Sequence, residues 1–580
     1  MKLQQEITDR IKSSHHEILE TDIKLSRPAD SSHGDFTTNI ALVAAKKLGK
    51  KPLDLANELK TELEGLEGVE KVEIAEPGFI NFFVAKIGLL DNLSEILEKG
   101  EKYGRGGTLE SKKIMLEFAD PNPFKEFHIG HLRNISLGES FARLLEAQGA
   151  QVMRVNYQGD VGMHVAKALW GMRQTFDKLQ LTIDQFKKKP LKERIDFLGK
   201  AYAAGAKAYE EDDPSTGSGA KKEIQEINLK VYKKDPQIIE TWEEGKAWSL
   251  ENFEKIYKRV GTLYERLYFE SEVAERGKHL VLENIEKGIF ERHEGAIVFR
   301  GENEGLHTRV FVTKEDYATY EAKDLALAGV KYRDFPYDRS IIITAHEQGP
   351  YFKVILLAMK KIEPELAEKT EHYSFGFVSL KDEKMSSRLG NIISGEWLLD
   401  EAKKKIEANF KEIEEKTAEK VAVGAVKYSM LKVTKEAGIA FSFDESISLE
   451  GNSGPYIQYT YARTQSVLAK VKSQSFDKAQ DKKSKVKSTI QNSKLEQEEI
   501  EIIRMLSKFP EVVEEAGDKF APSTLCNYLF ELSQKFNLFY QKHKIIGGDS
   551  EEFRLLLTKA VGQVIKNGLY LLGIQSPEKM

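Results

Sequence analysis

The 580-residue chain is long enough for about four domains, and its 41% hydrophobic and 31% charged residues are the balance of an ordinary soluble protein. A formal net charge of −5 gives no bulk sign of nucleic-acid binding, so any RNA site must be a local basic or aromatic surface. A single cysteine, Cys526, excludes internal disulfides and cysteine-clustered zinc sites. The start of the chain lacks a signal-peptide pattern and no apolar run is long enough to span a membrane, so we expect a cytoplasmic protein without a membrane partner.

Residues 1–110 predict a small α+β domain. Two helical patterns, at 40–48 and 53–63, precede two strand-like runs at 71–75 and 79–84. A glycine-rich run at 104–107 predicts the linker to the next domain.

Residues 111–400 predict a Rossmann-like domain with a parallel sheet. The first part has a β–α–β pattern of strand 113–118, helix 131–147 and strand 151–157. A charged, helix-rich stretch at about 170–275 predicts an insertion. The sheet is expected to resume with strand 340–344, helix 352–361 and strand 373–380.

Residues 401–580 predict an all-α bundle, which makes the chain a multidomain α/β protein. The exception is the segment from Lys470 to Lys494, whose eight lysines and two aspartates indicate a solvated loop or insertion of unknown role. The apolar positions Tyr528, Leu529, Leu532, Phe536, Phe539 and Tyr540 recur at helical spacing, so most are expected to be core.

The loop at 119–131 joins a strand to the start of a helix, where free N–H groups and the helix dipole favour phosphate. Gly130 leaves space for a flat purine, His128 and His131 can donate hydrogen bonds to phosphate oxygens, and Lys125 adds positive charge. A capped turn with incidental histidines would explain this one loop equally well.

A second loop, after strand 373–380, carries Lys384, Ser386 and Ser387. Cations there could stabilise a pyrophosphate leaving group. The alternative is an exposed basic turn without a function, which is more common for lysine-rich loops. The sequence has no Walker-type loop, which disfavours γ-phosphoryl transfer.

Taken together, the segments 127–131 and 384–388 resemble the two signature loops of class I aminoacyl-tRNA synthetases. Further stretches extend the resemblance to the arginyl-tRNA synthetases over nearly the whole chain: 117–122, 156–162, 319–326, 451–459 and 567–574. The last two are stretches that other class I synthetases do not share.

The resemblance implies an arginine–tRNA ligase. Such an enzyme activates arginine with ATP, transfers it from the adenylate to the 3′ end of tRNA(Arg), and releases AMP and pyrophosphate. It implies ATP with Mg²⁺ and no protein metal site, tRNA binding before arginine activation, and a 1–110 domain that approaches the tRNA elbow. The helical 401–580 domain would bind the anticodon, where a few exposed aromatics could stack on bases. We expect a monomer, although the sequence does not fix the oligomeric state.

The site residues implied by the resemblance fall into four groups. The catalytic group is His128, His131 and Lys384, and the ATP-binding group is Lys125, Gly130, Ser386 and Ser387. The arginine-binding group is Glu117, Asn122, Tyr320, Asp324 and Gln348, in which carboxylates suit a cationic fork. The tRNA-binding group is Asn81 and Phe79, and Asn81 is equally well read as a strand residue beside a turn.

Two positions depart from the family pattern. Ser387 stands where many class I enzymes carry lysine, so Lys125 would supply part of the positive charge at the phosphates. Val161 replaces an aromatic residue. Two alternatives remain open at this stage: a catalytically inactive homologue that binds RNA, and a class I synthetase for another amino acid.

Overall fold

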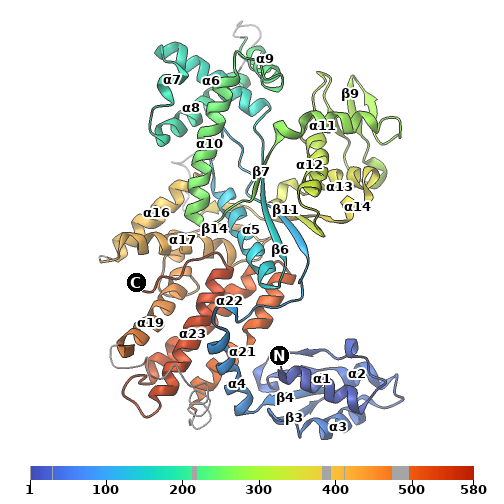
Figure 1. Ribbon diagram of the computed structural model, residues 1–580, viewed down its shortest axis with the longest axis vertical. Coiled ribbons are helices and arrows are strands. Elements are labelled where there is room, and N and C mark those ends of the chain that lie inside the picture. The colour runs from blue at the N-terminus through green and yellow to red at the C-terminus, as the bar shows by residue number, and fades with distance from the viewer. Residues whose placement is uncertain (1, 29, 212–218, 382–392, 411, 473–494) are drawn as a thin grey trace.

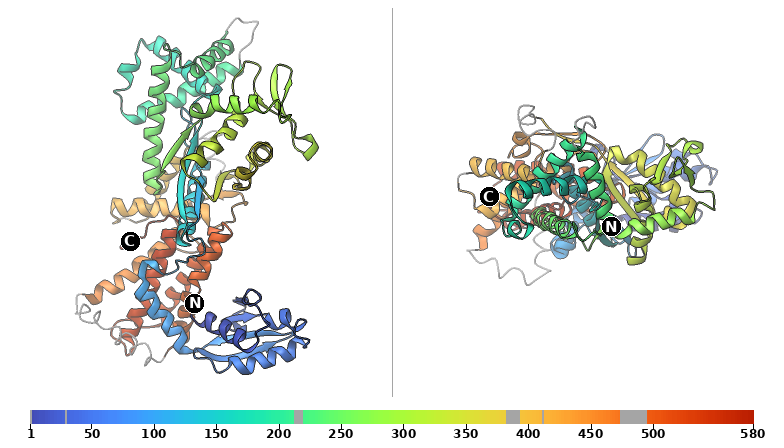
Figure 2. Two further views of the ribbon diagram at one scale, coloured as in Figure 1. Left: turned by 45° about the vertical axis from the view of Figure 1, so that its right-hand side comes forward. Right: turned by 90° about the horizontal axis from the view of Figure 1, so that it is seen from above.

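The computed structural model describes residues 2–28, 30–211, 219–381, 393–410, 412–472 and 495–580. The molecule is elongated (Figure 1): the N-terminal domain lies at one end, a helical insertion at the other, and a parallel sheet between them. A second view keeps this order of parts (Figure 2). Within the described ranges, none of the helices combines the length and the apolar character needed to cross a bilayer.

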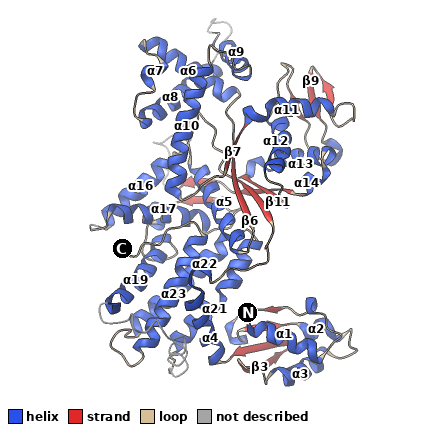
Figure 3. Cartoon of the chain, in the orientation of Figure 1, coloured by secondary structure: helices blue, strands red, loops and turns tan. Residues whose placement is uncertain are grey.

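A five-stranded parallel sheet forms the centre of the molecule (Figure 3), in the order β12-β11-β5-β6-β7. Its strands are β5 (Lys113–Glu117), β6 (Gln151–Gln158), β7 (Arg266–Phe269), β11 (Arg339–Ala345) and β12 (Thr370–Phe375). Four of the five residues of β5 are buried, as expected for a central strand of a parallel sheet with both faces covered. The predicted Rossmann-like fold is therefore confirmed.

Five helices accompany the sheet strands: α5 (Ile129–Ala147), α11 (Glu270–Glu283), α12 (Tyr320–Asp334), α13 (Gly349–Ile362) and α14 (Pro364–Glu368). Most positions of α5 are buried, because the sheet and the C-terminal helices enclose it. A small antiparallel sheet lies between α11 and α12, with strands β8 (Glu291–His293), β9 (Ala296–Phe299) and β10 (Arg309–Val312).

The helical insertion consists of α6 (Met163–Leu179), α7 (Ile183–Phe186), α8 (Leu191–Glu210), α9 (Ala220–Tyr232) and α10 (Ile239–Val260). Its core is separate from that of the sheet and is built around Trp242 and Trp248. The strand β7, inside the range expected for the insertion, belongs to the central sheet, so the chain returns to the sheet earlier than 275.

The N-terminal domain has a four-stranded antiparallel sheet in the order β1-β2-β4-β3. Its elements are α1 (Lys2–Ser14), β1 (Leu25–Ser26), β2 (Phe36–Thr38), α2 (Ile40–Ala45), α3 (Pro52–Leu63), β3 (Val69–Ala75) and β4 (Phe79–Val84). Helix α4 (Lys86–Lys99) leads out of the domain and packs on α21 and α23. The α+β character expected of this region is thus observed.

The C-terminal region is mainly helical. It contains β13 (Val378–Leu380), α16 (Gly395–Asn409), α17 (Glu415–Leu431), β14 (Ile439–Phe441), α18 (Phe443–Ser446), α19 (Gly454–Lys472), α21 (Gln497–Asp518), α22 (Pro522–Lys542) and α23 (Glu551–Leu571). Of the apolar stripe on α22, only Tyr540 is substantially exposed, at 39%. The predicted strand 373–380 is wrong as one element: it divides at Gly376 and Phe377, and β13 pairs with β14 outside the central sheet.

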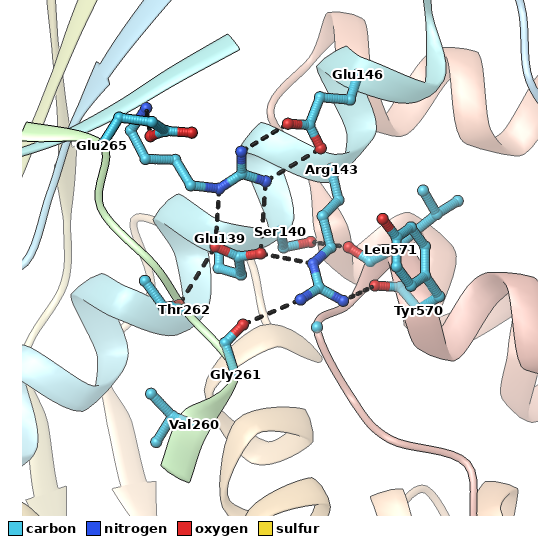
Figure 4. A network of polar contacts seen from close by, with 12 residues as sticks. Glu139, Ser140, Arg143, Glu146, Val260, Gly261, Thr262, Glu265, Tyr570 and Leu571 are labelled. Carbon is cyan, nitrogen blue, oxygen red and sulfur yellow. Dashed lines mark hydrogen bonds and ion pairs between the residues drawn. The ribbon is translucent and has the colours of Figure 1, made fainter. Parts of the chain in front are cut away.

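A buried polar network joins α5 to the C-terminal helices (Figure 4). The carboxylate of Glu139 accepts hydrogen bonds from Arg143 (2.6 Å), Arg154 (3.0 Å) and Thr262 (3.3 Å). Arg143 also donates to the carbonyl of Tyr570 at 2.8 Å. These directional contacts fix the end of the insertion and helix α23 against the same face of α5.

Candidate functional site

A cavity of about 750 Å³ opens at the carboxyl ends of the central strands. Its wall includes Glu117 from the end of β5, Tyr157 from the end of β6, Ala345 from the end of β11 and Phe375 from the end of β12. This edge of a parallel sheet is where doubly wound folds bind ligands. Ala119 and Asp120, directly after β5, adopt left-handed backbone conformations with φ of 78° and 49°. Such strain in non-glycine residues is typical of functional loops.

The two histidines of the first signature cap the start of α5. The Nδ1 of His128 accepts the N–H of Gly130 at 3.2 Å, and the Nδ1 of His131 accepts the N–H of His128 at 3.1 Å. Because each Nδ1 is an acceptor, a neutral ring carries its proton on Nε2 and can donate there. Burial lowers the pKa of both histidines, and Lys125 adds to the effect, so both rings are neutral at pH 7.

Gly130 lines the cavity beside these rings, and a Cβ at this position would lie 3.0 Å from the His128 ring. Lys125 is half-buried and lies outside the set of cavity-lining residues, with its ammonium 5.6 Å from the centre of the Tyr202 ring. Burial, together with the charge of Lys167, lowers the pKa of Lys125.

The cavity wall is acidic, with six carboxylates: Glu117, Asp120, Glu270, Glu321, Asp324 and the exposed Glu347. Three of them are ion-paired, Glu117 with Lys331 at 2.7 Å, Glu321 with Arg309 at 3.0 Å, and Glu270 with Lys323. Asp120, Asp324 and Glu347 lie outside these pairs, so the wall has three more carboxylates than the pairs neutralise.

Asp324 and Asp120 are held by neutral hydrogen bonds. Asp324 accepts from the hydroxyl of Tyr351 at 2.6 Å, and Asp120 accepts from the N–H of Tyr157 at 2.8 Å. Burial raises the pKa of Asp324 to about 8, with Glu117 and Glu270 adding to the rise. Burial and the charge of Glu117 also raise the pKa of Asp120 well above its usual value. A cation entering the cavity would relieve this accumulation of negative charge.

The neutral residues expected to bind substrate lie in the same cavity. The Oδ1 of Asn122 accepts the N–H of Gly159 at 2.9 Å, which fixes the amide against the end of β6. Tyr320 begins α12 and is 50% exposed, and Gln348 precedes α13. The structure thus brings Glu117, Asn122, Tyr320, Asp324 and Gln348 together with His128, Gly130 and His131.

Lys384, Ser386 and Ser387 lie outside the described residues. On one side of that segment, Val378 lines the cavity, and on the other side Ile393 does so. The carbonyl of Ile393 accepts the N–H of Ile129 at 2.9 Å. Residues on both sides of that segment therefore belong to the cavity wall.

The two residues expected to contact tRNA lie on β4, far from the cavity. Asn81 is only 5% exposed and pairs with Thr37 and Glu73 in the sheet, whereas Phe79 is 37% exposed. Of the two, Phe79 has the side chain that is available at the surface.

The sequence reasoning missed the cations that neutralise the acidic wall, Lys323, Lys331 and Arg309. Lys331 follows Asp324 by two helical turns on α12. A lysine on the apolar side of that helix could have indicated a buried ion pair. Its partner Glu117 lies 214 residues away on β5, and no local pattern predicts that pairing.

Comparison with known proteins gives matches along the whole chain. Residues 92–443 match the family model "tRNA synthetases class I (R), catalytic domain", residues 457–580 match "DALR anticodon binding domain", and residues 1–84 match "Arginyl tRNA synthetase N terminal domain".

Individual relatives match over the same extent. The chain is 32% identical to an arginine–tRNA ligase of Treponema denticola, over 97% of this chain and 96% of that protein. It is 33% identical to an arginine–tRNA ligase of Fusobacterium nucleatum, over 96% and 95%. The structure titled Thermus thermophilus arginyl-tRNA synthetase superposes with a TM-score of 0.76 at 24% identity, covering 100% of this chain and 99% of that one, which supports the fold.

Proposed function

The chain belongs to the arginyl-tRNA synthetases of class I, and from that premise we propose that arginine and ATP react in the cavity at the end of the central sheet. The protein is an arginine–tRNA ligase, which activates arginine as arginyl-adenylate and transfers it to the 3′ end of tRNA(Arg). A carboxylate oxygen of arginine attacks the α-phosphorus of ATP, and the bond to pyrophosphate breaks. The 3′-terminal ribose of the tRNA then takes the arginyl group, and AMP leaves.

The acidic wall is the proposed site of the arginine side chain. Asp324 would pair with the guanidinium as a carboxylate, and Glu117, oriented by Lys331, would add a second negative charge. Asn122, Tyr320 and Gln348 would orient the substrate by neutral hydrogen bonds. The excess of carboxylates over cations in the cavity wall supports this assignment.

The capped start of α5 is the proposed nucleotide site. The Nε2–H groups of His128 and His131 would donate to phosphate oxygens as negative charge moves toward pyrophosphate. Gly130 would leave room for the purine, and Lys125 would add positive charge near the phosphates. Lys384, Ser386 and Ser387 are proposed to complete this end.

ATP is proposed to enter as its Mg²⁺ complex, with the phosphates as the ligands of the metal. In the described part of the chain no cluster of histidine, cysteine, aspartate and glutamate side chains has the arrangement of a metal site. The protein's own residues would therefore act on the phosphates and on arginine.

The remaining domains are proposed to bind tRNA(Arg). Residues 401–580 contain the matched anticodon-binding module, and 1–110 form the additional domain, whose β4 carries Phe79 and Asn81. The catalytic domain would span 111–400 between them. We further propose a cytoplasmic monomer in which tRNA binding precedes arginine activation.

One observation carries the proposal. A pair of neutral histidines at the start of α5 and an acidic wall with more carboxylates than cations line the same cavity.

ATP–pyrophosphate exchange with arginine should require tRNA(Arg), and charging should reject other amino acids. Replacing His131 by alanine should lower the kcat of exchange roughly 100- to 1000-fold with little change in KM. The exposed His293 on β8, replaced in the same way, is the matched control. Exchange that proceeds fully without tRNA(Arg) would refute the proposed order of binding, and an unaltered kcat in the His131 variant would refute the proposed nucleotide site.

A further inference from the structure

Arg133 lies on α5 two residues after His131 and is fully buried, with 0% of its surface exposed. Its guanidinium donates to four backbone carbonyls: Gly376 (2.7 Å), Phe377 (3.1 Å), Thr434 (3.4 Å) and Lys435 (3.0 Å). Two of these carbonyls belong to the link between β12 and β13, and two to the link between α17 and β14. The Arg133 side chain thus connects the β12–β13 link and the α17–β14 link to helix α5.

Packing alone does not account for this arginine. Burial lowers the pKa of Arg133 to about 10, opposed by the charge of Glu436, so the guanidinium remains charged at neutral pH. Among the described residues, its polar partners are carbonyl oxygens and not carboxylates. Burying a cation without a counter-ion is unfavourable, and an apolar side chain of similar size would avoid that penalty.

The two loops are closely interlocked where Arg133 holds them. The N–H of Gly376 donates to the carbonyl of Lys435 at 2.9 Å, and the N–H of Ile439 donates to the carbonyl of Phe377 at 2.8 Å. A Cβ on Gly376 would lie only 2.5 Å from the carbonyl oxygen of Glu436. The position of residues 376–378 therefore depends on the link after α17 and on the guanidinium that joins the two.

Residues 376–378 form part of the cavity wall, and the Phe377 side chain is 57% exposed there. They line the same cavity as His128 and Gly130, which are proposed to bind the nucleotide. The acidic residues proposed for arginine come instead from β5 and α12. An exposed phenyl ring and an adjacent valine offer a flat, apolar surface of the kind on which a base or ribose packs.

We propose that Arg133 is a positioning residue for ATP: it holds the Gly376–Val378 wall in place by binding the carbonyls of Gly376 and Phe377. This inference rests on the proposed function, since it takes the α5 end of the cavity as the nucleotide site. It means that a change at Arg133 should weaken the binding of ATP and leave the binding of arginine unaltered.

The test is ATP–pyrophosphate exchange in the presence of tRNA(Arg), with ATP and arginine varied separately. Arg133→Lys keeps the charge but cannot span four carbonyls. It should raise the KM for ATP about tenfold while the KM for arginine stays within about twofold. Gly376→Ala should produce the same split without altering the guanidinium, because its new Cβ collides with the link after α17.

Arg154→Lys is the matched control. Arg154 is also buried, but its guanidinium pairs with the carboxylates of Glu139 and Glu146, away from the cavity wall. This variant should lower the melting temperature without separating the two KM values.

Equal changes in both KM values for Arg133→Lys and Gly376→Ala, or an unchanged KM for ATP in folded variants, would overturn the inference. A loss of thermal stability together with the ATP-specific split would support it. Absence of exchange by the unaltered protein in the presence of tRNA(Arg) would instead overturn the proposed function, and the inference with it.

Discussion

Arginine binding should strengthen steeply with pH because of one carboxyl group. Asp324 lies in the acidic wall of the cavity, and burial raises its pKa to about 8. At neutral pH most molecules of the free protein therefore carry a protonated Asp324. A guanidinium favours the ionised form, so its binding should expel the proton.

The size of the effect follows from the ionised fraction. With a pKa of about 8, Asp324 is ionised in roughly 1% of molecules at pH 6, about 9% at pH 7 and half at pH 8. If only the ionised form binds, the apparent Kd is the intrinsic Kd divided by that fraction. The affinity for arginine should then rise about 50-fold from pH 6 to pH 8. Binding at pH 7 should release about 0.9 proton per arginine.

Isothermal titration calorimetry can measure both quantities. Arginine is titrated into the protein at pH 6, 7 and 8, a range in which its own α-amine stays protonated. Repeating the pH 7 titration in buffers of different ionisation enthalpy gives the number of protons released. The same series with Asp324→Asn should show weaker binding, by about two orders of magnitude at pH 8, and a much smaller pH dependence, with Asp120 left as the second wall carboxyl of raised pKa.

Asp334→Asn is the matched control, because Asp334 ends the same helix and hydrogen-bonds the hydroxyl of Tyr268. It should retain the full pH dependence. An affinity that is constant from pH 6 to pH 8 with no proton released would refute the reasoning. So would a pH dependence that is undiminished in Asp324→Asn.

Two further predictions concern buried lysines. Lys331→Met should lower the free energy of unfolding by about 3–5 kcal/mol, measured by urea denaturation, because it leaves Glu117 charged and buried, and adding Glu117→Gln should recover most of the loss. Lys427 donates to the carbonyls of Val260 and Gly573, and burial lowers its pKa to about 7. The unfolded chain therefore binds more protons than the folded protein between pH 7 and about 10, so stability should rise with pH in that window by at most about 1.4 kcal/mol per unit. Thermal melts at pH 7, 8 and 9 should show this slope, and Lys427→Met should abolish it; a slope that persists in the variant would contradict the assignment.

The sequence predicted those parts of the fold that depend on local patterns. The strands at 113–118 and 340–344 are short apolar runs bounded by turns, and they appear as β5 and β11 within a residue or two. Most of the residues proposed to bind substrate lie in short segments that resemble the family, and Gln348 follows the strand expected at 340–344. Their meeting in one place follows from parallel strands that end at the same edge of the sheet.

What the sequence did not reveal depends on distant contacts. The four-residue strand β7 is flanked by helices and has too little pattern of its own to be separated from the insertion. The run 373–380 looks continuous, yet Gly376 packs against the carbonyls of Glu436 and Ala437, and the chain changes sheets there. The charge balance of the cavity also depends on partners such as Lys331 and Glu117, which no local spacing connects.

Helix α5 shows how polar groups fix the geometry that this chemistry requires. Apolar contacts tolerate small slides, whereas a buried hydrogen bond is lost when its partners move apart. Along α5, Asn134 donates to the carbonyl of Ile343 at 2.9 Å, and Ser140 donates to that of Leu571 at 3.0 Å. Arg133 and Glu139 add charge-assisted hydrogen bonds to two further regions of the chain, through the carbonyl of Gly376 and the hydroxyl of Thr262. The helix that begins with the histidine pair is therefore anchored by directional bonds to the sheet, to the cavity wall and to the C-terminal helices. These bonds hold the histidine Nε2 atoms in place, as the proposed stabilisation of the transition state would require.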